Sequence, residues 1–253
     1  MNFSTDIIHI AAFLGAGLSV SLASVASGIG VGYIAEEASY AVMKQPNAKD
    51  QMFKTMLIGQ AATGTGGIFS LVIALLLLFG GLDNADGGWF KVTALFSAGI
   101  AIGFGSIGPV FGAGYAGGQA CKSIGRMPKK SNEIMGNMLI GQALAQTSSI
   151  FALVIALLLL YSTPQQANFP GITLGGIITK SLALLGAGLS IGLGTIGPGI
   201  GIGNVAGRAN DMLGRYPKQR PNIMKTMFLG AAVSESTAIY SLVISLLLLF
   251  AVK

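Results

Sequence analysis

The chain has 253 residues, of which 52% are hydrophobic and 9% are charged. An average soluble protein carries roughly 25% charged residues, so this composition cannot cover the surface of a water-soluble globule. The mean hydropathy of +0.72 likewise indicates an integral membrane protein. The 38 glycines show no Gly-X-Y period, which excludes collagen, and the single cysteine, Cys121, excludes a disulfide framework.

One pattern repeats three times along the chain. The string LVIALLLL occurs at Leu71–Leu78 and at Leu153–Leu160, and LVISLLLL follows at Leu242–Leu249. A shared glycine lies upstream of each string, at Gly59, Gly141 and Gly230. The repeat predicts three tandem modules with boundaries at 1–82, 83–165 and 166–253.

Each module contains two long apolar segments separated by a short polar loop. A membrane-spanning helix needs about 20 apolar residues, and every segment exceeds that length. We therefore predict an all-α membrane protein of three helical hairpins. The predicted helices cover residues 5–44, 52–80, 89–125, 133–161, 173–213 and 222–252.

Basic residues gather around the loops within the hairpins. The positive-inside rule then places these loops in the cytoplasm and both termini outside. Lys91, Lys180 and Lys253 are the exceptions, near the acidic Asp83 and Asp86. The net charge of +6 thus reflects membrane topology, and we expect no nucleic-acid partner.

Glycine is concentrated in the first helix of each module. Pairs four residues apart, such as Gly188 with Gly192 and Gly199 with Gly203, form grooves that let helix backbones approach closely. This pattern predicts a tight inner ring of helices. Pro109 and Pro198 lie within the same helices and predict kinks. The segment Gly197–Gly203 lacks the strand that a nucleotide-binding loop requires.

One carboxylate, Glu235, lies near the middle of an apolar helix. Charged side chains at that depth are costly and are a functional hypothesis by default. Three hydroxyl residues follow it, Ser236, Thr237 and Tyr240. The alternative is a protonated carboxyl that only bonds neighbouring helices.

These features resemble the c subunit (proteolipid) of rotary F- and V-type ATPases, in a fused triple-hairpin form. The resemblance covers the chain three times and includes the Glu-Ser-Thr-x-x-Tyr helix that begins at Glu235. It implies a homo-oligomeric rotor ring in a prokaryotic cell membrane, in contact with lipid. It also implies a stator a-type subunit that supplies an arginine, a central stalk and an ATPase head.

The polar loops resemble the family's stalk-docking loop, because each keeps a basic residue and a proline. The residues that the resemblance assigns to stalk contact are Lys44, Gln45, Pro46, Arg126, Pro128, Arg215 and Pro217.

Alignment on the repeated glycine puts Gly64, Gln146 and Glu235 in the family's carboxylate position. Two of the three hairpins therefore cannot carry an ion by the family's chemistry. Few ions per turn favour ATP-driven pumping over synthesis.

The identity of the ion stays open between H⁺ and Na⁺, and Glu235 would be a metal ligand only for Na⁺. The first-helix positions that supply an oxygen in sodium-binding relatives are apolar here, at Val31, Ala113 and Ile202, which favours protons. The resemblance offers further helpers to Glu235: Val233, Ser236, Thr237 and Tyr240 on its own helix, with Thr65 of the next chain or Thr147 of the same chain as the neighbour.

The chain contains no catalytic triad or phosphate loop, so we expect no active site of its own and no bound cofactor. His9 and Cys121 are interpreted as structural. The rival interpretation is a passive proteolipid pore or a structural membrane protein, in which Glu235 lines a static channel.

Overall fold

The computed structural model describes residues 3–80, 88–163 and 170–251. Hairpin 1 consists of α1 (Phe3–Lys44), α2 (Lys49–Thr63) and α3 (Thr65–Phe79). Hairpin 2 consists of α4 (Gly88–Gly105), α5 (Ile107–Arg126) and α6 (Ser131–Tyr161). Hairpin 3 consists of α7 (Leu174–Gly194), α8 (Ile196–Arg215) and α9 (Arg220–Phe250). The six predicted apolar segments are all helical and long enough to cross a membrane.

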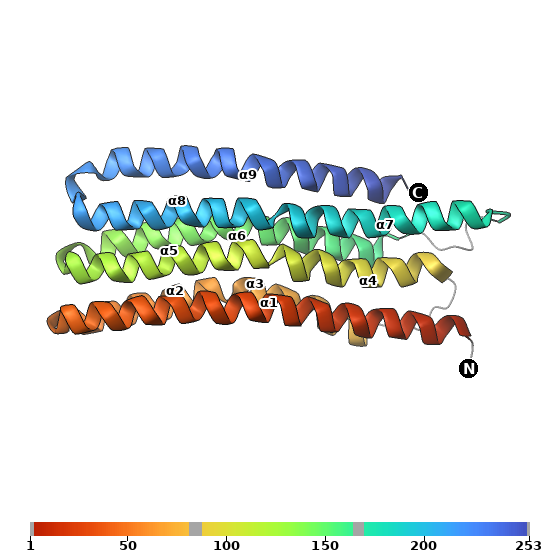
Figure 1. Cartoon of the computed structure of the whole chain (residues 1–253), viewed down its shortest axis with the longest axis horizontal. Helices are drawn as coiled ribbons and strands as arrows, with labels where there is room; N and C mark the ends of the chain where they lie inside the picture. Colours follow the sequence, from red (N-terminus) through yellow and green to blue (C-terminus); the bar gives the residue numbers. More distant parts are fainter. Residues whose placement is uncertain (1–2, 81–87, 164–169, 252–253) are drawn as a thin grey trace.

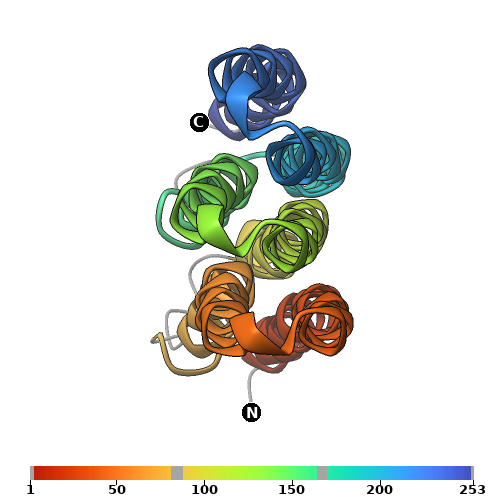
Figure 2. The ribbon, with the colours of Figure 1, turned by 90° about the vertical axis from the view of Figure 1, so that its left-hand side faces the viewer.

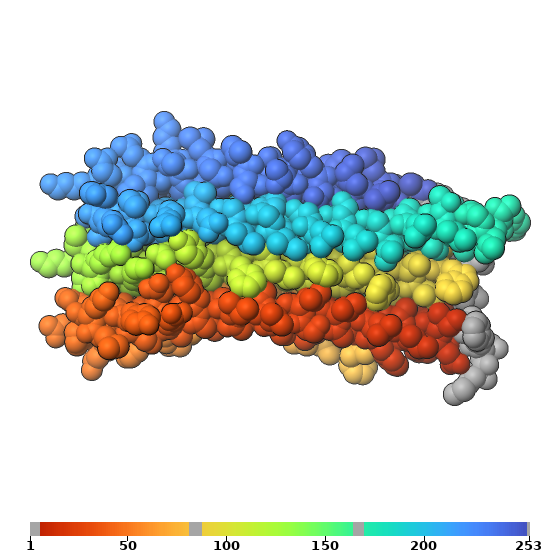
Figure 3. Space-filling model, in the orientation of Figure 1, coloured from red at the N-terminus to blue at the C-terminus, as the bar shows by residue number. Residues whose placement is uncertain are grey.

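The three hairpins stand side by side in chain order (Figures 1 and 2). Their first helices form one layer, in which α5 packs between α1 and α8. The second helices form the other layer, in which α6 lies between the second helices of hairpins 1 and 3. The space-filling view shows the first-helix layer as one continuous elongated face (Figure 3). This is the arrangement expected of an arc cut from a ring of hairpins.

The loops within the hairpins lie together at one end of the bundle, and the two termini lie at the other (Figure 1). Each loop contains a short 3₁₀ helix, at Pro46–Ala48, Pro128–Lys130 and Pro217–Gln219. The residue before each proline is not helical, with φ of −139°, −135° and −129° and ψ of 71°, 71° and 65°. Proline disfavours the helical conformation in the preceding residue, so each first helix ends there. The predicted hairpin boundaries at 82/83 and 165/166 lie outside the described residues.

Three of the predicted helices differ from the structure, because they are interrupted. The helix predicted over 89–125 breaks at Ser106, and the one over 173–213 breaks at Thr195, three residues before Pro109 and Pro198. Proline has no N–H and clashes with the carbonyl four residues back. The Gly105 carbonyl, left without that N–H, accepts a hydrogen bond from Thr195 Oγ1 at 3.4 Å. The α1 helix has Ser27 at the equivalent position and is continuous.

The helix predicted over 52–80 breaks at Gly64, where there is no proline to signal it. The second helices also begin earlier than predicted, at Lys49, Ser131 and Arg220, and two first helices extend to Arg126 and Arg215.

Glycine contacts set the spacing of the first-helix layer. A β-carbon on Gly203 would overlap the backbone of Gly112, and one on Gly112 would overlap Gly199. Gly114 makes the same kind of contact with Gly30 of hairpin 1. The helices therefore meet backbone to backbone, as the predicted grooves require.

We expect Gly203→Ala to destabilise the chain by about 1–3 kcal/mol, because the added methyl group has no room between the two backbones. Gly136→Ala is the matched control, since nothing lies within 4 Å of the methyl group it adds. Thermal unfolding of the full chain in detergent measures both effects. Equal stability of the two variants would contradict the close packing.

Candidate ion-binding site

The three second helices carry equivalent residues at Gly64, Gln146 and Glu235. Successive hairpins are offset by 82 and then 89 residues, counted between Gly59, Gly141 and Gly230. The same offsets relate the basic residues that begin the three loops, Lys44, Arg126 and Arg215. Each residue that makes a contact between hairpins 1 and 2 therefore has a known equivalent position at the interface of hairpins 2 and 3.

At the interface of hairpins 1 and 2, an uncharged amide occupies the carboxylate position. Gln146 is buried, and its Nε2 donates to the carbonyls of Thr63 at 3.3 Å and Ala62 at 3.5 Å. The break at Gly64 makes this possible: the Gly67 N–H donates to Gly64 O at 3.1 Å instead of continuing the helical pattern to Thr63 O. At the level of Gln146, the interface is thus held by hydrogen bonds between neutral groups.

Two further glutamines, which the sequence analysis did not single out, bind second helices to first helices. Gln60 Nε2 donates to Val31 O at 3.2 Å, and Gln142 Nε2 donates to Ala113 O at 3.0 Å. Gln142 Nε2 also reaches Thr63 Oγ1 of hairpin 1 at 3.1 Å. Hairpin 3 has Ala231 at this position, so it lacks the amide. The change from Gly-Gln-Ala to Gly-Ala-Ala in the third repeat was the available signal.

Glu235 lies on α9 and is partly buried. Its neighbour Ser234 donates to Pro198 O of α8 at 3.3 Å, which ties the two helices of hairpin 3 together at this height. Toward the loop end from the carboxylate, Ala113, Ala145, Ile202 and Ala231 form one buried apolar cluster. Two of the three first-helix positions, Ala113 and Ile202, therefore lie in a buried apolar cluster and offer no side-chain oxygen.

The hydroxyl that follows each equivalent position bonds to its own helix. Thr65 Oγ1 donates to Ala62 O at 2.9 Å, Thr147 Oγ1 to Leu144 O at 2.7 Å and Ser236 Oγ to Val233 O at 2.7 Å. The three predicted helpers Thr65, Thr147 and Ser236 thus share one conformation. In each case the hydroxyl hydrogen is already used.

The other predicted helpers on α9 lie on its outward side. Val233 is 73% exposed, Tyr240 is 66% exposed, and Thr237 is also exposed. Their counterparts in hairpins 1 and 2 are less exposed, because the hairpin that follows lies alongside them. No hairpin of the described structure covers this side of hairpin 3, so we call it the open end of the row.

Ser148 is a residue that the sequence analysis missed. It occupies the position of Gly66, where a β-carbon would lie 3.5 Å from Gln146 Oε1. By the same register, we expect the Ser148 side chain of α6 to face Glu235 of α9. Ser148 is fully buried, and its Oγ has no hydrogen-bond partner among the described residues. The available signal was a hydroxyl two residues after Gln146, where hairpin 1 has a glycine.

The predicted stalk-contact residues lie at the loop end of the bundle, and one of them, Arg126, also joins hairpin 2 to hairpin 3. Arg126 of α5 forms an ion pair with Asp211 of α8, and Arg215 Nε lies 3.1 Å from the same carboxylate. Lys44 is exposed and is paired with no carboxylate within the described chain.

Comparison with known proteins agrees with this architecture. The model of the ATP synthase C-subunit family matches residues 14–77, 96–159 and 185–248, once in each hairpin. The chain belongs to this family. It is 30% identical to the K subunit of the A-type ATP synthase of Methanocaldococcus jannaschii, over 95% of this chain and 96% of that protein.

Shorter relatives match one hairpin each. The ATP synthase c subunit of Petrotoga mobilis is 47% identical over 31% of this chain and 86% of its own length. That of Alkaliphilus oremlandii is 49% identical over 30% of this chain and 90% of its own. The chain is thus a fused, non-catalytic membrane rotor protein, and its family implies assembly into a ring within a rotary ATPase.

A hydrophobic carbodiimide should label this rotor protein at Glu235 alone, because the other two equivalent positions hold Gly64 and Gln146. Labelling should fall as pH rises, since the reagent attacks the protonated acid. Peptide mass spectrometry of the labelled chain locates the adduct, and Glu235→Gln is the control that removes it. Strong labelling elsewhere in the apolar segments would contradict the assignment.

Proposed function

We propose that this rotor protein carries protons through reversible protonation of Glu235 and works in an ATP-driven pump. The observation that carries the proposal is the position of Glu235: of the three equivalent sites, it alone has an ionisable side chain. A carboxyl group facing lipid is favoured in its neutral form, because desolvation penalises the charge. Rotation then brings Glu235 to a stator subunit whose arginine favours release of the proton.

The oxygens around Glu235 favour a proton over Na⁺. A sodium ion must exchange its hydration shell for several oxygens, whereas a proton needs the carboxylate and one hydrogen-bond partner. Val233, Thr237 and Tyr240 lie on the open side of α9, and the first-helix residues Ala113 and Ile202 are apolar. Ser148 Oγ, buried and unpartnered among the described residues, is the hydrogen-bond partner we assign to Glu235.

The loops at Lys44–Pro46, Arg126–Pro128 and Arg215–Pro217 are proposed to face the cytoplasm and contact the central stalk below the ATPase head. The basic residues around them support this orientation by the positive-inside rule, and both termini would then lie outside. We propose a prokaryotic cell membrane as the location. No cofactor is required, because the transported ion is the only species that the site must hold.

Pumping follows from the number of carboxylates. Moving one charge against 100 mV costs about 2.3 kcal/mol, so a fixed free energy from ATP drives few ions against a steep gradient or many against a shallow one. A ring made only of this chain has one carboxylate for every three hairpins. Few ions per ATP suit a pump and make synthesis at an ordinary membrane potential difficult.

Glu235→Gln should abolish ATP-driven proton uptake by reconstituted vesicles, because an amide cannot release a proton. Ring assembly should survive, since Gln146 already occupies an equivalent interface. Normal uptake by the variant would refute the proposed carrier.

Ser148→Ala should change the pH dependence of carbodiimide labelling, because it removes the partner assigned to Glu235. The matched control is Thr237→Ala, which removes a hydroxyl from the open side of α9 and should leave the profile unchanged. Millimolar sodium should not slow labelling of the unmodified protein. Protection by sodium would show that the carried ion is Na⁺.

Gln146→Glu adds a second carboxylate per chain at a buried interface position. If that site becomes functional, the number of protons moved per ATP should rise and the steepest gradient reached should fall. Parallel measurements of ATP hydrolysis and limiting pH gradient in vesicles test this expectation. Efficient ATP synthesis at a physiological gradient, by a ring shown to contain only this chain, would overturn the pump assignment.

A further inference from the structure

The two ends of the hairpin row differ from its interior. Along α1, a β-carbon on Gly17, Gly28 or Gly32 would meet nothing within 4 Å. Their counterparts in hairpin 3 are Gly188, Gly199 and Gly203, and each would collide with hairpin 2. The outer side of α1 therefore has the small residues of an inter-hairpin contact without the hairpin that would fill it.

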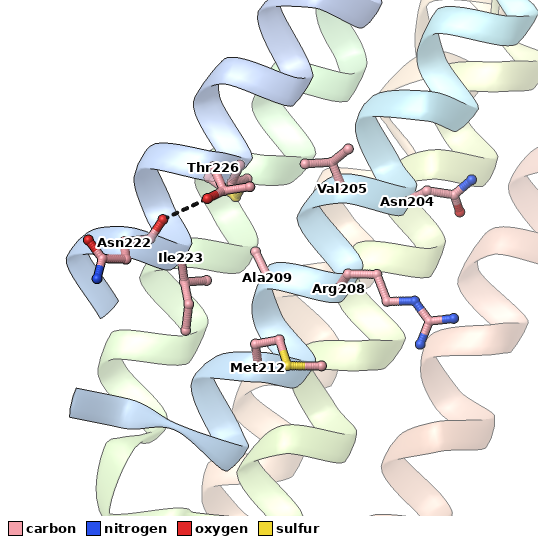
Figure 4. Close-up of a pocket in the computed structure, with 9 residues that line it drawn as sticks. Asn204, Val205, Arg208, Ala209, Met212, Asn222, Ile223 and Thr226 are labelled. Atoms are coloured by element: carbon pink, nitrogen blue, oxygen red, sulfur yellow. Dashed lines mark hydrogen bonds between the residues drawn. The ribbon is translucent and has the colours of Figure 1, made fainter. Parts of the chain in front are cut away.

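The opposite end carries a groove of about 530 Å³ between α8 and α9. Figure 4 shows Met212, Ile223 and Val205 around it, with Asn204 and Arg208 on the side of α8 away from α9. In hairpin 2 the equivalent surface is filled: Leu213 of hairpin 3 belongs to one buried cluster with Ile134 and Met138. The residue equivalent to Leu213 in hairpin 1 is Val42.

We propose that hairpin 1 of a second copy of this chain fills this groove, with its Glu36 paired to Arg208. The inference rests on ring assembly and adds the contact that joins one chain to the next. The complementarity lies in three features of the two ends: register, size and charge.

The register comes from the interfaces within the chain. At the first interface, a β-carbon on Gly118 would meet the Tyr33 ring and lie 3.4 Å from Glu37 Cγ. At the second, a β-carbon on Gly207 would meet the Tyr115 ring and lie 3.4 Å from Gln119 Cγ.

Both interfaces therefore place the same positions together. The counterpart of these glycines in hairpin 1 is Glu36, and the counterparts of the facing residues in hairpin 3 are Asn204 and Arg208. Repeating the register sets Glu36 of the next chain against Asn204 and Arg208.

At this junction, the larger side chain is on the opposite partner from the one that carries it within the chain. Within the chain, a tyrosine packs on a glycine, at Tyr33 with Gly118 and at Tyr115 with Gly207. Between chains, the smaller Asn204 would face the larger Glu36. The shorter side chain on α8 leaves the room that a glutamate needs.

Charges are matched as well. Glu36 and Arg208 are both exposed, and neither forms an ion pair within the described chain. The interior interfaces each have an ion pair of their own, Lys122 with Glu37 at 3.5 Å and Arg126 with Asp211. A Glu36–Arg208 pair would give the third interface its own pair and fix the head-to-tail order of chains.

Cysteine cross-linking in membranes tests the contact. In a Cys121→Ser background, Glu36→Cys with Arg208→Cys should form disulfides between chains, because disulfides require β-carbons about 3.5–4.5 Å apart. Mild oxidation should give a ladder of dimers, trimers and larger species that reductant removes. Each single-cysteine variant is a control and can give dimers at most.

Native mass spectrometry of the unmodified chain separates the two possible failures. A ring without a ladder, including one in which another subunit lies between copies, would overturn the Glu36–Arg208 contact and leave the rotor function intact. A chain that forms no ring would overturn both.

Charge exchange tests the pair itself. Arg208→Glu should lower ring yield roughly tenfold, because like charges facing each other across an interface oppose association. Combining it with Glu36→Arg should restore the yield. Lys218→Glu, an exposed reversal in the hairpin 3 loop, is the control expected to have no effect. Failure of the double variant to recover, in a ring that tolerates the control, would contradict the pairing.

Discussion

Backbone contact between glycine-lined first helices is the constraint on which the rest of this rotor protein depends. Gly112 of α5 contacts Gly199 and Gly203 of α8, and Gly114 of α5 contacts Gly30 of α1. None of these three helices can therefore slide along its neighbour without a collision. Close-packed interiors tolerate little displacement. The contacts therefore fix the register between successive hairpins, and the same register decides what faces the carboxylate position on the second helices.

That register gives each second helix two sides, which face different neighbouring hairpins. One side bears Gln146 or Glu235 and faces the preceding hairpin. The other side bears Ser148, which faces the following hairpin, or Thr237, which is exposed at the open end of hairpin 3. Within the chain, Gln146 closes one interface with neutral hydrogen bonds to Thr63 and Ala62. The other interface receives Glu235, so one chain combines an interface closed by an amide with one that holds the proposed ion carrier.

Fusion of three hairpins has allowed each interface to diverge. Tandem copies no longer need to be complementary to themselves, and the pairs Glu37–Lys122 and Arg126–Asp211 differ in kind and position. A heterologous head-to-tail contact forms a closed ring when the rotation from one subunit to the next divides a full turn evenly. The end-to-end junction proposed through Glu36 and Arg208 follows the same logic, with a charge pair where the interior interfaces pack a tyrosine on a glycine.

Sequence alone was sufficient for the three hairpins, the six apolar segments and the single mid-helix carboxylate, because repeats and helical length are properties of the chain in order. The tertiary structure decided where the helices break: Pro109 and Pro198 predicted kinks rather than breaks, and nothing local marked Gly64. It also decided how exposed each predicted helper of Glu235 is. Helical periodicity places Val233, Ser236, Thr237 and Tyr240 on one helix, but it cannot say which neighbour covers each side. Ser148 of α6 is buried because hairpin 3 packs alongside it. Tyr240 of α9 is exposed because no described hairpin covers that side of α9.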